Sequence, residues 1–147
     1  MAVFIDRDED AARALLRGVG VRFLRIDSPD HTEVMTDVLG GLDQERLRIV
    51  AEPPGDDDAA AAGMGAWHRN AVNEFETVLS GEGIVEFITL DGPVAVLIGA
   101  GDVMVVEKAE HRYRPITAQE WVLRFAADDL GASETGRESG PWPSAGV

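Results

Sequence analysis

Residues 67–126 read WHRNAVNEFETVLSGEGIVEFITLDGPVAVLIGAGDVMVVEKAEHRYRPITAQEWVLRFA, and this stretch decides the fold. Short β-rich runs recur along it at intervals of about 8–12 residues, a spacing typical of antiparallel sandwiches and barrels. Turn residues end these runs at Ser80-Gly81-Glu82-Gly83, Asp91-Gly92-Pro93 and Gly99-Ala100-Gly101-Asp102. Asp91-Gly92 is the strongest hairpin signal, because glycine tolerates the positive φ that a tight turn requires. We therefore predict a β-barrel core over about residues 46–127.

The residues before this stretch carry helix and strand signals in alternation. Acidic residues begin the first helical pattern and Gly18 follows its end, as at many helix termini. Asp30-x-x-Glu33 has the form of a capping box at the start of the second. The expected elements are helices over 8–18 and 31–42, strands over 21–26 and 46–51, and a loop over 52–65.

The chain as a whole fits one domain. Its 147 residues and 15.8 kDa are enough to bury one sizeable core. We expect a single, mainly β domain over residues 1–130, in which a short N-terminal α/β appendage precedes the barrel. Residues 131–147 have little hydrophobic pattern and contain Pro141 and Pro143, so we expect a flexible C-terminal tail.

Composition limits the partners. The chain has 27 acidic and 13 basic residues and a net charge of −14, whereas nucleic acids and anionic membranes favour Lys and Arg on their partners. It has no Cys, which excludes disulfides, thiolate metal sites and a cysteine nucleophile. No apolar run reaches the roughly 18 residues of a membrane span, and the acidic start is unlike a secretory signal. We expect a cytoplasmic monomer or homodimer that binds a small molecule, and neither nucleic acid nor membrane.

Two of the three histidines, His68 and His111, fall in the β-rich stretch, and a carboxylate, Glu74, follows His68 in the same stretch. His68 and Asn70 share one face of an extended segment, because strand side chains alternate. Glu74 can turn into the same interior at the start of the next strand, and His111 can enter from a different strand. Two imidazoles and one carboxylate leave coordination positions open, which suits non-haem Fe(II), Ni, Mn or Co. We interpret His31, at an expected helix start, as structural.

The pattern His68-x-Asn70-x₃-Glu74-x₆-Gly81 resembles the first motif of the cupin superfamily, His-x-His-x₃-Glu-x₆-Gly, and His111 resembles the histidine of the second. Within cupins the chain is most similar to the acireductone dioxygenase family, over about residues 8–130. Further short matches lie, in order, at 14–23, 74–83, 101–106, 111–113 and 123–125. The resemblance implies a double-stranded β-helix, that is, a jelly-roll barrel.

The resemblance also implies a metal centre. The implied ligands are His68, Glu74 and His111, with Asn70 as a further candidate. Fe(II) is the first expectation, and Ni(II), Mn(II) and Co(II) are alternatives. The family has a second histidine at the position of Asn70, and an amide oxygen is a poorer ligand for such metals than imidazole. Asn70 is therefore open to three interpretations: a weak ligand, a substrate hydrogen-bond donor or a bystander.

For function, the resemblance implies a dioxygenase that binds a chelating enediol-type molecule at the metal and cleaves it with O₂, with Glu74 and His111 as catalytic residues. The residues expected to line the substrate pocket are Tyr113, Arg124 and Glu76. Glu76 replaces a substrate-contacting arginine of the family, and the family's proline before the last histidine is missing, so we expect a diverged substrate. The alternatives are a cyclase, isomerase or lyase without O₂, in which Glu74 or His111 moves protons, and a non-catalytic binding cupin. In a metal-free pocket, Glu74 would pair with Arg69 or Arg124.

Overall fold

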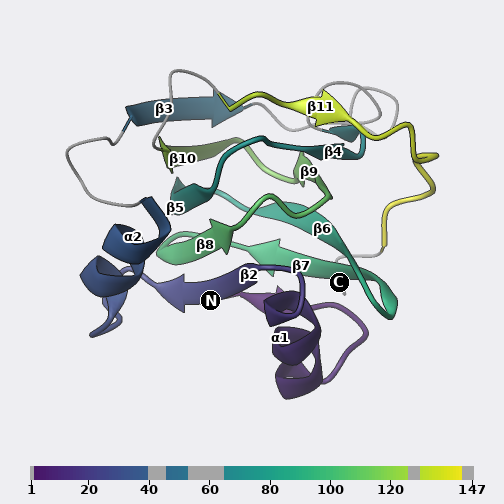
Figure 1. The fold of residues 1–147 in the computed structure, drawn as a ribbon, viewed down its shortest axis with the longest axis horizontal. Helices are drawn as coiled ribbons and strands as arrows, with labels where there is room; N and C mark the ends of the chain where they lie inside the picture. The colour runs from purple at the N-terminus through teal and green to yellow at the C-terminus, as the bar shows by residue number, and fades with distance from the viewer. Residues whose placement is uncertain (1, 40–45, 53–64, 126–129, 144–147) are drawn as a thin grey trace.

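The computed structural model describes residues 2–39, 46–52, 65–125 and 130–143, and two antiparallel sheets dominate it (Figure 1). The first sheet has the strand order β1-β7-β6-β9-β4-β11, with the bounds Val3–Phe4, Gly92–Ile98, Gly83–Thr89, His111–Pro115, His68–Arg69 and Ser133–Glu134. The second sheet has the order β2-β8-β5-β10-β3, with the bounds Val21–Arg25, Asp102–Val106, Glu74–Ser80, Gln119–Phe125 and Arg46–Glu52. The predicted mainly β class is confirmed.

Apolar side chains from both sheets meet in one core. Alternation places them there: along β10, Trp121, Leu123 and Phe125 are buried, while the residues between them are more exposed. The core also contains Phe23, Val78, Met104 and Val106 from the second sheet and Val85, Phe87, Val94, Val96 and Tyr113 from the first. Burying one such aliphatic or aromatic side chain contributes about 1.5–3 kcal/mol, so this core is the main source of stability.

Two helices flank the sheets. Helix α1 spans Glu9–Arg17, against an expected 8–18; the Asp8 side chain caps its first turn, and Leu16 joins the core. Helix α2 spans His31–Leu39, and the end of the expected 31–42 lies outside the described residues. It packs on the outer face of the second sheet through a smaller cluster that contains Val34, Val38, Leu39, Phe75, Val103 and Val105. Neither helix is long and apolar enough to cross a membrane.

The β6–β7 hairpin turns one residue earlier than the sequence predicts. Thr89 pairs with Gly92, so Leu90 and Asp91 form the turn. Gly92 opens β7 with a φ of 85°, a conformation that side chains with a Cβ rarely adopt. The glycine correctly predicts a hairpin, but it stands at the start of β7 and not in the turn itself.

The segment after residue 130 lies partly on the first sheet. Strand β11 pairs with β4 and forms the edge of that sheet (Figure 1). The flexibility expected for 131–147 stays a prediction. Most of the expected loop at 52–65 lies outside the described residues.

Candidate functional site

Strand pairing brings the two predicted histidine ligands together. His68 on β4 is directly opposite His111 on β9 in the antiparallel register. Their ring centroids are 4.4 Å apart, and both side chains are buried. Sequence alternation put each ring on the inner face, and the β4–β9 pairing makes them neighbours.

Both imidazoles are held in the same way. Nδ1 of His68 is 2.8 Å from the carbonyl oxygen of Ala66, and Nδ1 of His111 is 2.8 Å from that of Ala109. A carbonyl can only accept, so each Nδ1 is the donor and the lone pair of each neutral ring lies on Nε2. Metal-binding histidines are commonly oriented by such a bond from the other ring nitrogen.

Two carboxyl groups lie on the inner face of β5, at Glu74 and Glu76. The Glu74 carboxylate accepts a hydrogen bond from the Asn70 amide and also contacts Glu76. Burial, together with the nearby charge of Glu74, raises the pKa of Glu76 well above its ordinary value. Burial also lowers the pKa of His111; Glu74 opposes this shift and His68 adds to it. The site therefore favours the neutral imidazole of His111 and the protonated carboxyl group of Glu76.

Asn70 is 5% exposed, and its Oδ1 is a buried acceptor without a hydrogen-bond partner in the described part of the chain. A buried polar atom without a partner destabilises the fold by about 1–3 kcal/mol. A cation or a hydrogen-bond donor bound next to Asn70 Oδ1 would remove this cost. The donor types fit a divalent cation. The arrangement fits less closely, since no three His, Asp or Glu side chains of the described residues are grouped to hold a metal ion.

The predicted pocket residues divide between two faces. Tyr113 shares the inner face with His111; its hydroxyl donates to Gln119, and its ring meets Trp121 edge-on at 5.0 Å. Arg124 is not brought to this group. It lies on the other face of β10, and its Nη1 is 3.8 Å from Sδ of Met35 in α2.

Two further expectations concern residues near the group. Arg69 does not pair with Glu74: its ion pair is with Glu110, at 3.6 Å. His31 packs edge-on against Phe75, with ring centroids 5.2 Å apart, in the cluster that seats α2. This packing agrees with a structural role for His31.

Sequence reasoning missed several groups that shape the site. No sequence pattern predicts that the carbonyls of Ala66 and Ala109 bind the histidines, since any residue type supplies a backbone oxygen. The Phe87 ring lies 5.7 Å from that of His111, and the two residues are paired across β6 and β9. Gln119, which is buried and bonded to Tyr113, would have been found as a lone polar residue before a run of alternating apolar ones.

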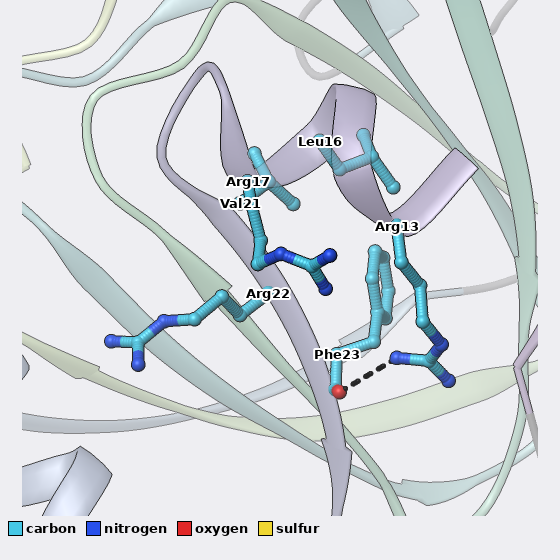
Figure 2. Close-up of a pocket in the computed structure, with 6 residues that line it drawn as sticks. All are labelled: Arg13, Leu16, Arg17, Val21, Arg22 and Phe23. Atoms are coloured by element: carbon cyan, nitrogen blue, oxygen red, sulfur yellow. Dashed lines mark hydrogen bonds between the residues drawn. The ribbon is translucent and has the colours of Figure 1, made fainter. Parts of the chain in front are cut away.

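A separate cavity of about 120 Å³ lies between α1 and β2 (Figure 2). Its lining residues are Arg13, Leu16, Arg17, Val21, Arg22 and Phe23. Arg13 donates to the Phe23 carbonyl at 3.0 Å (Figure 2). Arg22 pairs with Glu107 at 3.5 Å. Ligand pockets usually measure about 300–1,000 Å³. This cavity is smaller and contains none of the predicted site residues, so the histidine–carboxyl group is the stronger candidate.

Comparison with solved structures shows the fold. The chain superposes on an acireductone dioxygenase from Bacillus anthracis, with a cadmium ion in its active centre, at a TM-score of 0.60 and 14% identity, covering 86% of this chain and 92% of that one. A mutant oxalate decarboxylase from Bacillus subtilis matches at a TM-score of 0.48 and 16% identity, over 78% of this chain and 27% of that one. No protein-family model and no curated protein matches the chain. The predicted mainly β jelly-roll fold is confirmed.

Proposed function

We propose that this chain is a metal-dependent cupin enzyme that holds a divalent cation with His68, Glu74 and His111. The observation that carries the proposal is the matched pair of imidazoles, each tied through Nδ1 and each with its Nε2 lone pair available. A divalent cation bound there would act as a Lewis acid and leave positions open for a chelating molecule and O₂. Fe(II) is the first candidate, followed by Ni(II), Mn(II) and Co(II). The cadmium of the acireductone dioxygenase with the same fold supports a metal at this place.

The reaction that we propose is oxidative cleavage of a small enediol-type molecule. The protein's own residues would prepare it in three ways. The two backbone carbonyls fix the orientation of the rings, burial keeps His111 neutral, and the aromatic rings of Phe87 and Tyr113 exclude water. Glu76, as a neutral carboxyl group, could donate a proton to a hydroxyl or carbonyl oxygen of the substrate.

The substrate is expected to differ from that of acireductone dioxygenases. The amide of Asn70 adds a neutral hydrogen-bonding group beside the imidazoles. Glu76 adds a carboxyl group where the family that the sequence resembles has an arginine. Both changes disfavour a strongly anionic enediolate and favour a ligand that offers hydroxyl groups.

A second candidate function rests on the contact between Glu74 and Glu76. Two carboxyl groups in contact, one charged and one neutral, can act as base and acid in a single turnover. The same pocket would then catalyse an isomerisation, cyclisation or elimination without O₂.

Metal analysis of the purified protein tests the first proposal. We expect near-stoichiometric transition metal in the native protein and its loss from His111→Ala, with full content in the matched control His31→Gln. A native protein that stays empty after incubation with each of the four metals would contradict the metal centre. O₂ uptake with small enediols then separates the oxidative reaction from the O₂-independent one.

A further inference from the structure

The C-terminal segment crosses the free edge of β4. Glu134 on β11 pairs with His68, and the backbone N–H of Thr135 donates to the carbonyl of Trp67 at 3.0 Å. Figure 1 shows β11 beside β4, after which the chain continues along the edge of the molecule. We call residues 133–142 the C-terminal strap. The strap gives β4 a second neighbour, so the strand that carries His68 is held from both sides.

Glu110, next to His111, is the first anchor of the strap. Its carboxylate accepts from Nε and Nη2 of Arg137 at 2.9 and 3.0 Å, and from the hydroxyl of Thr135 at 2.6 Å. A forked pairing of this kind is stronger and more directional than a single contact. The Glu110 side chain is 4% exposed, so these bonds are shielded from water on the carboxylate side.

Arg112, on the other side of His111, is the second anchor. Its Nη1 and Nη2 donate to the carbonyls of Gly140 and Pro141 at 2.9 and 3.2 Å. Its guanidinium carbon also lies 4.0 Å from the ring centroid of Trp142 and 5.0 Å from that of Trp67. Cation–π contacts are stronger with a desolvated arginine than with an exposed one, so the contact with Trp142 helps to bind the end of the strap.

These anchors alternate with the site residues. Strand β4 has two residues, and a single register pair, His68 with His111, joins it to β9. A strand this short contributes little pairing energy of its own. Glu110 and Arg112 face outward on either side of His111 and grip the strap, while His111 faces inward. The contacts that hold the strap on the sheet therefore also restrain the position of β4.

We propose that the C-terminal strap is a positioning element, in which Arg137 and Trp142 hold β4 against β9 and so keep His68 opposite His111. Its effect on metal binding rests on the proposed function. Its effect on the placement of the His68 ring does not.

The test uses the full-length double variant Arg137→Gln/Trp142→Ala. It removes the forked pairing of Arg137 with Glu110 and the ring contact of Trp142 with Arg112, keeps the bonds from Thr135 and to the strap carbonyls, and changes no residue of the barrel strands. Glu138→Gln is the matched control, because Glu138 is exposed and makes no hydrogen bond or ion pair with the described residues. Three quantities are measured: hydrogen exchange along 67–70 and 133–142, the imidazole NMR signals of the three histidines, and the dissociation constant for Co²⁺.

In the double variant we expect faster exchange in both segments and altered His68 signals, with His31 signals unchanged. Co²⁺ affinity should fall about tenfold, the lower end of the effect of losing outer support at a metal site. The variant Arg137→Lys/Trp142→Phe should restore the native His68 signals in part, which a general loss of stability does not explain.

Two results would overturn the proposal. One is native His68 signals and native exchange at 67–70 in a variant whose strap exchanges freely. The other is an undisturbed strap, which would show that Arg137 and Trp142 do not hold it. A native protein that fails to bind Co²⁺ would overturn the metal centre alone, because exchange and NMR still decide the positioning role.

Discussion

The inner and outer faces of the β4–β9 pair do different work. The inner face carries His68 and His111, which face the barrel interior together with the carboxyl groups of β5. The outer face carries Trp67, Glu110 and Arg112, which bind the strap. Period-two alternation separates the residues of the proposed site from those that support it, along only a few positions of the chain. The faces should therefore respond differently to substitution: the outer one in stability, the inner one in ligand binding.

The largest expected effect is on the outer face, in Arg112→Ala. Arg112 is 2% exposed, and its Nε donates to Glu86 at 2.7 Å, so the change leaves a buried carboxylate without its partner. We expect the free energy of unfolding to fall by about 3–5 kcal/mol. Urea denaturation measures it. In the control Arg7→Ala, which breaks an exposed pair with Asp91, the loss should stay below about 1 kcal/mol; equal losses would contradict the difference between buried and exposed pairs.

The inner face is probed by His68→Gln. Loss of the bond to the Ala66 carbonyl should lower the free energy of unfolding by only about 1 kcal/mol. Co²⁺ at one hundred times its dissociation constant should stabilise the native protein by about 2.7 kcal/mol and should not stabilise this variant. Thermal unfolding with and without Co²⁺ gives both numbers. Equal stabilisation of the two proteins by Co²⁺ would show that His68 is not a metal ligand.

Asn70→His sharpens the same face by adding an imidazole where the cupin motif has one. We expect metal affinity to rise about tenfold, or about 1.4 kcal/mol, because imidazole is the better ligand for these metals. Competition with a coloured chelator measures the change. Asn73→His is the control, since Asn73 is partly exposed and lies outside the group. Unchanged or weaker binding in Asn70→His would show that the Asn70 position does not face the metal.

The inner face could be predicted from the sequence for a physical reason. Alternation fixes which side chains face inward, and turn glycines fix where each run ends. The sequence also contained the reason that Arg124 faces away: it stands between Leu123 and Phe125, which the barrel buries. The outer face could not be predicted, because Arg137 and Trp142 lie in a segment without periodicity. Their partners depend on the path that the C-terminal segment takes across the folded barrel, and no local sequence pattern predicts that path.

The smallest effect expected is the pH dependence of the Glu110 anchor. The hydrogen bond from Arg137 is the main cause that lowers the pKa of Glu110 in the folded protein, with help from Thr135 and Arg69. A carboxyl group whose pKa is lower when folded stabilises the fold above its unfolded pKa, and this contribution disappears as the pH falls through the folded pKa. Native protein should thus be more stable than Glu110→Gln at pH 7. The difference should begin to shrink below the ordinary glutamate pKa of about 4.3 and disappear below the lowered pKa of the folded protein. Because Arg137 is about half exposed, the difference should stay below about 1 kcal/mol.

Urea unfolding of both proteins between pH 3 and pH 7 tests this, since the other titrating groups are common to the two and cancel. A difference that does not shrink between pH 7 and pH 3 would mean that Glu110 holds the strap by shape and neutral hydrogen bonds, and that the charge of the outer face contributes nothing to it.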